Sequence, residues 1–200
     1  MVNKLPLSHD NPFDVALFNF IDTHLHLYHQ LNFTPNAVTT LSLFTGILCA
    51  YLIYKKQYLY AGFAYMISYY LDCVDGKLAR KYNMVTKFGD FYDHLSDVTK
   101  LVIIVYALYV NDKHKLVKML LILIPLFILS LFHFGCQQAL YDNTSCCLLN
   151  NALSDSPTLD IFKLPKETCN TLIHDTKYFG CGTFQLVFTI MLIFLNKISI

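Results

Sequence analysis

Apolar residues in this chain gather in five long runs separated by short polar breaks. The runs cover about residues 37–54, 58–81, 88–110, 116–136 and 179–195. The first four are about 18–24 residues long and the fifth is slightly shorter, and such lengths allow a helix to cross a bilayer core of roughly 30 Å. The pattern therefore predicts an all-α fold, a polytopic transmembrane helical bundle of about five to six spans.

Residues 13–30 follow a different pattern, in which apolar positions recur at i, i+3, i+4 and i+7 along one side. Ile21 and Leu25 belong to that side. Asp14 and Asp22 are too costly for a spanning segment. The pattern predicts an amphipathic helix, which would lie flat on the membrane surface. A core helix of a soluble protein shows the same periodicity, but the apolar run just downstream favours the membrane surface.

The first apolar run has a clear start signal. Thr34 is a suitable N-cap, and Pro35 fits the first helical position. The sequence thus divides into an N-terminal segment with the interfacial helix, residues 1–33, and a membrane-embedded domain, residues 34–200. Within that domain residues 137–178 are polar, and they predict a loop or a degenerate span.

Composition supports a membrane protein. Hydrophobic residues make up 55% of the chain and charged residues 14%, against about 25% charged in ordinary soluble domains. The mean hydropathy is +0.43. A net charge of +1 gives no electrostatic reason to expect a nucleic-acid partner. The seven cysteines are odd in number and scattered, so no disulfide framework is predicted.

The junction of the second and third runs carries a dense polar motif. It reads Asp72-Cys-Val-Asp75-Gly76-Lys-Leu-Ala79-Arg80, then eight residues, then Gly89-Asp-Phe-Tyr-Asp93-His-Leu-Ser-Asp97. At about 100° per residue, each half of the motif falls on one face of its helix. The short connection 82–87 predicts a hairpin that places all four acids near one membrane face.

Four clustered carboxylates in a membrane protein need positive charge between them, because each costs on the order of 2.5–3.5 kcal/mol at a helix centre. The predicted metal ligands are Asp72, Asp75, Asp93 and Asp97. Oxygen ligands without His or Cys favour Mg²⁺, Mn²⁺ or Ca²⁺ over zinc. Four carboxylates can hold two divalent ions, and two such ions can act on both sides of a displacement at phosphorus.

Two other interpretations of the acids stay open at this point. They could form structural ion pairs with nearby cations, namely Lys77, Arg80, Lys87 and Lys100. They could instead mark a cation pathway, although they gather at one face rather than forming a chain across the bilayer. Arg80 is the sole arginine among 15 basic residues, and its planar fork of donors suits a phosphate.

The motif resembles the signature of the CDP-alcohol phosphatidyltransferase family, D-x-x-D-G-x-x-A-R-x(8)-G-x-x-x-D-x-x-x-D, at every fixed position. Upstream, Pro35-Asn36-x-x-Thr39 resembles the start of the family's first span. The resemblance covers roughly residues 10–135. It implies a multi-pass membrane enzyme of phospholipid biosynthesis, often a homodimer, whose active site faces the cytoplasm.

The resemblance also implies a reaction and its residues. An alcohol acceptor attacks a CDP-linked lipid or alcohol and CMP leaves, with two Mg²⁺ or Mn²⁺ ions as cofactors. Asp97 would be the catalytic base and complete the metal site. The residues implied to bind the CDP moiety are Asn36, Thr39, Gly76, Ala79, Arg80 and Gly89.

Two substrate classes compete. CDP-diacylglycerol could donate to inositol or a glycerol phosphate, an interpretation favoured by the short chain and by residues 86–89. Alternatively, diacylglycerol could attack CDP-choline or CDP-ethanolamine, which Asp75-Gly76-Lys77 and Asp93-His94 resemble. The first class is the preferred prediction. Cytoplasmic orientation follows from the basic residues around the motif hairpin.

The chain departs from the family pattern near its end. Members commonly have six spans, whereas five are predicted here. Either one span is lost, or a degenerate segment near Leu159–Leu164 dips into the membrane.

Overall fold

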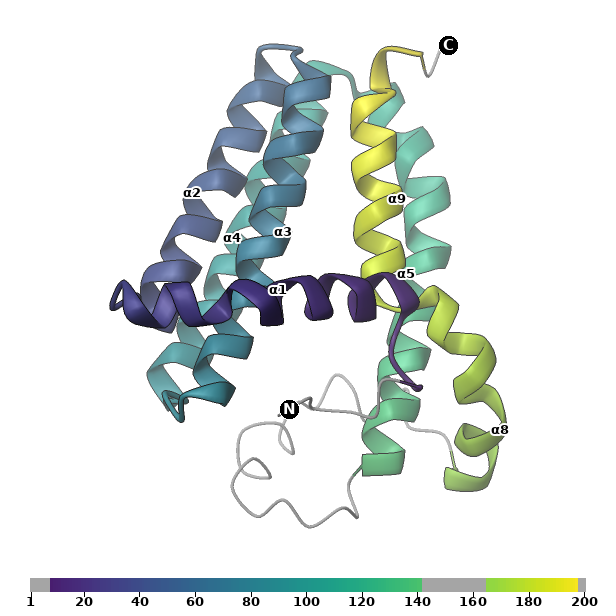
Figure 1. Cartoon of the computed structure of the whole chain (residues 1–200). Coiled ribbons are helices and arrows are strands. Elements are labelled where there is room, and N and C mark those ends of the chain that lie inside the picture. The colour runs from purple at the N-terminus through teal and green to yellow at the C-terminus, as the bar shows by residue number, and fades with distance from the viewer. Residues whose placement is uncertain (1–7, 142–164, 198–200) are drawn as a thin grey trace. The chain divides into compact units, whose positions relative to one another are not determined.

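The computed structural model describes residues 8–141 and 165–197, and all regular elements in these ranges are helices. The elements are α1 (Pro12–Gln30), α2 (Pro35–Tyr54), α3 (Tyr58–Lys81), α4 (Lys87–Asn111), α5 (Lys113–Tyr141), α8 (Lys166–Thr176), η1 (Lys177–Phe179), α9 (Cys181–Ile193) and η2 (Leu195–Lys197) (Figure 1). The predicted all-α fold is confirmed, and each of the first four predicted runs lies in one helix, whereas the fifth is centred on α9 and ends in η2.

Threonine N-caps fix where two helices of the site begin. The Thr34 side chain accepts a hydrogen bond from the backbone N–H of Ala37 at 3.2 Å, and Pro35 is the first residue of α2. Thr86 accepts from the N–H of Gly89 at 3.0 Å and so begins α4. The predicted start of the first apolar run is therefore correct.

The chain divides into two compact units. The first unit comprises residues 17–122 and 185–197 of the described chain, and the second unit comprises residues 8–16, 123–141 and 165–184. The motif lies wholly in the first unit. The two units are described separately below.

In the first unit, α2 packs against both α3 and α4. From Leu17 onward, α1 runs across these helices rather than along them (Figure 1). Its apolar side buries Ile21 and Leu25 completely, in a cluster with Val74 and Leu78 of α3. The predicted amphipathic helix is thus present, and its apolar stripe anchors it to α3.

In the second unit, polar side chains near the start of α1 bind backbone groups around the start of α9. Asn11 donates to the Lys177 carbonyl at 2.7 Å, and the Gly182 N–H donates to Asp14 at 2.9 Å. Asp14 thus satisfies a backbone donor near the start of α9, where a negative charge is favourable.

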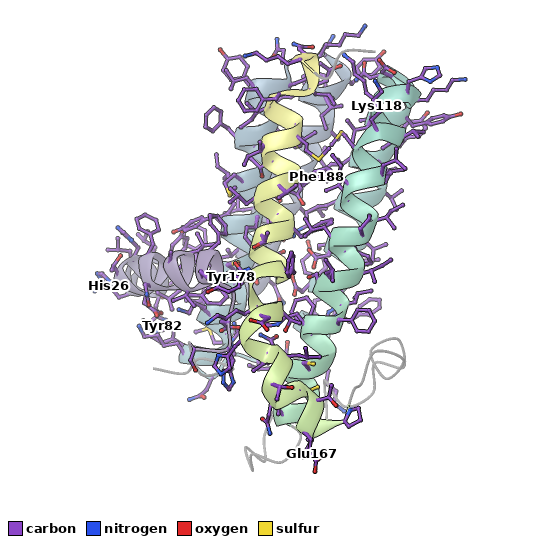
Figure 2. All side chains as sticks on the ribbon, turned by 90° about the vertical axis from the view of Figure 1, so that its right-hand side faces the viewer. His26, Tyr82, Lys118, Glu167, Tyr178 and Phe188 are labelled. Atoms are coloured by element: carbon purple, nitrogen blue, oxygen red, sulfur yellow. The ribbon has the colours of Figure 1, made fainter. Side chains whose placement is uncertain are left out.

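Three segments are long and apolar enough to cross a membrane: Pro35–Tyr54, Lys113–Gln137 and Lys166–Ile193. Side chains project outward all along the helices (Figure 2). Many of the exposed ones are large and apolar, among them Phe44 and Leu121, which are 62% and 70% exposed. Such surfaces suit contact with lipid. These features are those of an integral membrane protein.

The two helices that carry the motif are long as well, with 24 residues in α3 and 25 in α4, but they are not among the three segments. Their tyrosines and motif acids lower the local hydropathy. That α3 and α4 also span the membrane stays a prediction.

The polar stretch 137–178 proves helical at both of its described ends. The helix α5 continues to Tyr141, and α8 occupies Lys166–Thr176. The segment Leu159–Leu164, considered above as a degenerate span, lies outside the described residues.

Candidate metal and phosphate site

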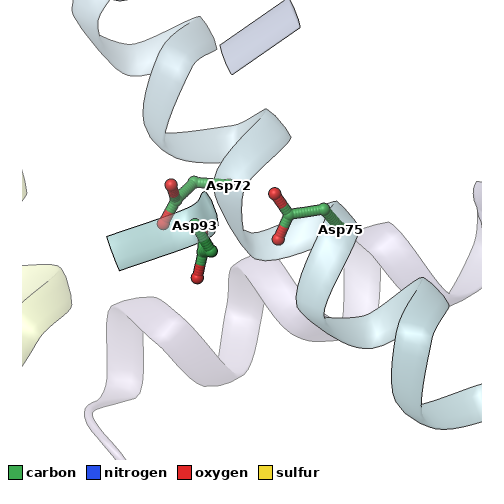
Figure 3. Close-up of side chains that lie close together, drawn as sticks. All are labelled: Asp72, Asp75 and Asp93. Atoms are coloured by element: carbon green, nitrogen blue, oxygen red, sulfur yellow. The ribbon is translucent and has the colours of Figure 1, made fainter. Parts of the chain in front are cut away.

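Three motif acids converge between α3 and α4. Asp72 and Asp75 come from α3 and Asp93 from α4, and one carboxylate oxygen of each lies within 4.8 Å of the others (Figure 3). Residues three apart on a helix share a face, and the hairpin between α3 and α4 turns the second face toward the first. Among the described residues, Asp97 lies outside this three-acid group.

The buried acid of the group is Asp75, which is 4% exposed. The Thr39 hydroxyl lies 2.5 Å from Asp75 Oδ2 and 3.1 Å from the Pro35 carbonyl oxygen. Thr39 is itself 2% exposed. The start of α2 therefore orients one oxygen of the carboxylate and leaves the other free for a ligand.

Lys100 connects the group to Asp97. Its Nζ lies 2.8 Å from Asp72 Oδ1 and 2.8 Å from Asp97 Oδ1. It also donates to Ser42 Oγ at 2.9 Å. The lysine is 9% exposed, whereas the Asp97 side chain is 51% exposed. Asp97 thus stands at the open edge of the site, paired with a buried ammonium.

The basic end of the motif lies on α3. A Cβ at Gly76 would stand 3.2 Å from both terminal nitrogens of Arg80, so the glycine leaves room for the guanidinium. Arg80 Nε is buried without a hydrogen-bond partner among the described residues. The Ala79 carbonyl accepts from Met84 N at 2.8 Å as the chain leaves α3.

Two further predicted residues meet where α2 and α4 begin. A Cβ at Gly89 would stand 3.0 Å from Asn36 Oδ1 and 3.0 Å from Thr86 Oγ1. The small residue therefore admits the Asn36 side chain, and larger residues at position 89 would displace it.

The residues present fit a divalent metal ion. Asp93 Oδ1 is buried and has no hydrogen-bond partner among the described residues, although an unpaired buried carboxylate oxygen is costly. It lies in a group that offers only carboxylate oxygens, the ligands preferred by Mg²⁺ and Mn²⁺. An ion bound to Asp72, Asp75 and Asp93 would satisfy it.

Only some of the ion pairs expected of a purely structural network are present. Lys100 does pair with motif acids, but Lys77 turns away and pairs with Asp22 of α1 at 2.6 Å. No ion pair to Asp75 or Asp93 is found within the described residues. The acids therefore outnumber the side-chain cations that meet them.

Sequence reasoning did not single out the groups that seat Lys100. Ser42 Oγ accepts a hydrogen bond from the Lys100 ammonium, and a Cβ at Gly46 would stand 2.7 Å from Lys100 Cγ. Ser42 follows Thr39 by three residues and Gly46 follows Ser42 by four, so all three lie on one face of α2. The sequence signal for this seat was a polar residue and a small residue on the same face as Thr39, within an otherwise apolar span.

Comparison with known proteins decides the family. A profile of the CDP-alcohol phosphatidyltransferase family matches residues 32–146, more than half of the chain. The chain belongs to this family. The matched range begins just before α2 and includes every motif residue described above.

Curated relatives are similar over shorter stretches. An archaetidylinositol phosphate synthase from Pyrococcus horikoshii is 35% identical over 68 residues, covering 34% of this chain and 36% of the relative. A CDP-diacylglycerol–serine O-phosphatidyltransferase from Helicobacter pylori is 36% identical over 64 residues, covering 32% and 27%. A CDP-diacylglycerol–inositol 3-phosphatidyltransferase from Drosophila melanogaster is 34% identical over 65 residues, covering 32% and 29%.

The match thus spans about a third of the length of these relatives. No solved structure matches the chain significantly.

Proposed function

We propose that this protein is a metal-dependent phosphatidyltransferase that joins the phosphatidyl group of CDP-diacylglycerol, or a similar CDP-linked lipid, to a polar alcohol. The observation that carries the proposal is the convergence of Asp72, Asp75 and Asp93, with a buried and unpartnered Asp93 oxygen. Membership of the family supports the reaction class. An inositol or glycerol phosphate acceptor fits the sequence best, and two of the cited relatives carry inositol in their names.

The reaction needs a proton acceptor and an anion site. The alcohol oxygen would form a bond to the phosphorus that bears the lipid, and the pyrophosphate P–O bond would break with its electron pair leaving on CMP. Asp97 would take the alcohol proton, since its half-exposed carboxylate can be reached from outside. Arg80 would donate its buried N–H groups to the nucleotide phosphates.

A divalent ion on the three acids would neutralise phosphate charge and polarise the reacting P–O bonds. Asn36 and Gly89 would border the cytidine nucleotide, where a small residue gives a flat ligand room to approach. Gly76 would let the Arg80 guanidinium lie against α3 and reach the nucleotide, and Ala79 would keep the same surface free of bulk.

Ion transport is the less favoured alternative. Intramembrane acids can mark a cation route, but such a route needs polar groups that continue across the bilayer. The far half of α3, residues 58–69, and the far half of α4, residues 101–110, contain no acid. We therefore expect no cation flux in proteoliposomes, and flux abolished by Asp75→Asn without any CMP release would favour a carrier.

The deciding experiment is a CMP-release assay on membranes that contain the protein. Labelled CDP-diacylglycerol or CDP-choline is supplied with a panel of acceptors, namely inositol, inositol phosphate, serine, glycerol phosphate and diacylglycerol. We expect release from CDP-diacylglycerol with one polar acceptor, abolished by chelator and restored by Mg²⁺ or Mn²⁺. Release from CDP-choline with diacylglycerol would assign the protein to the other substrate class.

The matched control is Asp75→Asn. This variant removes a carboxylate that is 4% exposed but keeps the shape of the side chain and a hydrogen-bond acceptor for Thr39. It should fold and give no CMP. Full wild-type activity in excess chelator would reject the metal-dependent mechanism. The cytoplasmic orientation and a homodimer stay predictions.

A further inference from the structure

The Lys100 ammonium lies between two acids of the site, Asp72 and Asp97, in the place where a second metal ion would otherwise bind. We infer that Lys100 is a built-in cation that fills the position between Asp72 and Asp97, so that the chain takes one divalent ion, at Asp72, Asp75 and Asp93. The sequence alone predicted two. The inference rests on the proposed function, since it concerns the metal of that same site.

The ammonium is fully satisfied where it lies. A lysine has three N–H donors, and Lys100 Nζ has three oxygen partners within hydrogen-bond distance. They are Asp72 Oδ1 at 2.8 Å, Asp97 Oδ1 at 2.8 Å and Ser42 Oγ at 2.9 Å. Two of the three are charged, which makes the bonds strong. A metal ion entering between Asp72 and Asp97 would have to displace a group with no unmet donor.

The aliphatic stem of the lysine has its own slot. A Cβ at Gly46 would stand 2.7 Å from Lys100 Cγ and 2.9 Å from Cδ, so α2 gives way where the stem passes. Ser42 lies one turn earlier on α2 and provides the acceptor for the head. The slot is therefore shaped for a long cationic side chain, and Lys100 is 9% exposed within it.

Charge counting agrees with a single ion. Four motif acids face two fixed cations, Lys100 and Arg80, which leaves two negative charges. One divalent ion neutralises them. A second ion beside Asp72 would lie next to a buried ammonium, and the repulsion between the two cations would be weakly screened there.

The inference assigns Lys100 a positioning role. By holding one oxygen of Asp97, it keeps that carboxylate at the edge of the site and out of the three-acid group. A carboxylate that binds no metal remains free to accept the proton of an alcohol. The same residue would thus set the ion count and leave the base uncommitted.

The test is a count of bound ions. MnCl₂ is titrated into the purified full-length protein in detergent, without nucleotide, and free Mn²⁺ is followed by electron paramagnetic resonance. We expect one Mn²⁺ per wild-type chain. Lys100→Met keeps the length of the stem and removes the charge, so Asp97 is released and a second Mn²⁺ should bind. Combining Lys100→Met with Asp97→Asn should return the count to one.

Lys77→Met is the matched control, because Lys77 is equally buried at 6% exposure but pairs with Asp22 outside the site. It should leave the count at one. Two ions on the wild-type chain, or an unchanged count in a folded Lys100→Met protein, would overturn the inference. If Lys100→Met does not fold, the wild-type count alone decides. Two ions bound to the wild-type chain would overturn this inference but leave the proposed phosphatidyltransferase function intact. Absence of CMP release in the activity assay would overturn the proposed function but leave the number of bound ions unchanged.

Discussion

Two lysines are buried in the first unit, and they differ in how completely they neutralise the acids around them. Lys77 lies where α3 meets α1, and Lys100 lies where α4 meets α2 and α3; they are 6% and 9% exposed. Lys77 pairs with one carboxylate, Asp22 at 2.6 Å, and donates to the Phe18 carbonyl at 2.9 Å. Lys100 pairs with two carboxylates, beside further acids that it does not reach.

The difference lies in what remains after pairing. Around Lys77 the charges balance, and the aromatic ring of Phe18 lies 5.1 Å from its Nζ, so the region is complete as it stands. Around Lys100 negative charge is left over on Asp75 and Asp93. Buried ion pairs by themselves say little about stability or function. Uncompensated charge of one sign is the better indication that a ligand belongs there.

The strongest way to sharpen this comparison is to remove one aspartate partner of each lysine. Asp97→Asn should lower the transfer rate by about 10²–10⁴-fold, because proton transfer is lost. Excess Mg²⁺ should not restore it. Asp22→Asn should leave the rate per folded molecule unchanged. The measurement is CMP release against Mg²⁺ concentration for both variants.

Asp93→Asn separates the base from a metal ligand. Its apparent Mg²⁺ affinity should fall by at least about 10-fold, and excess Mg²⁺ should restore part of the rate, since proton transfer is intact. The same partial rescue is expected for Asp72→Asn and Asp75→Asn. If metal rescues Asp97→Asn but not Asp93→Asn, the two roles must be exchanged.

A smaller effect is expected at Arg80. Arg80→Lys keeps the charge but loses the two-pronged contact with phosphate, at a cost of about 1.5–3 kcal/mol, or roughly 10–100-fold in kcat/KM. The control is Lys81→Ala, which removes an exposed cation from the same helix end. Kinetics with varied CDP-diacylglycerol will check this. Wild-type kinetics in Arg80→Lys would mean that Arg80 makes no two-pronged contact with the substrate phosphate.

The smallest effect on transfer should come from Lys77→Met. The rate should stay within about twofold of wild type, while the free energy of unfolding falls by on the order of 2 kcal/mol, because Asp22 loses its partner but is about one-third exposed. Thermal unfolding in detergent measures the loss. A large fall in rate with unchanged stability would mean that Lys77 also serves the site, and the comparison of the two lysines would collapse.

Much of this arrangement could be predicted because it depends on helical spacing. The apolar runs predicted where the helices lie, and Thr34 and Pro35 predicted where α2 begins. The spacing of Asp72 and Asp75 predicted that both lie on one face of α3. Helix geometry also explains why Lys77 does not pair with the motif acids, as the ion-pair alternative would require. It lies two positions after Asp75, about 200° around the helix, and so faces α1.

What could not be predicted depends on how neighbouring helices pack. Which lysine reaches the acids is decided by the approach of α2 to α4, where Gly46 admits the Lys100 stem. No spacing within α4 contains that information. The helix α8 was likewise missed, because its sequence is polar and its apolar residues are few, among them the buried Cys169 and Ile173.

All the groups of the site belong to three consecutive helices, from Asn36 on α2 to Lys100 on α4, a segment of about 65 residues. Because α2 packs against both α3 and α4, one continuous stretch of the chain assembles the whole site. The relatives are similar over stretches of 64 to 68 residues, lengths comparable to that piece. The family profile, which matches residues 32–146, contains that piece whole, so a single short stretch of sequence is enough to carry every group of the site.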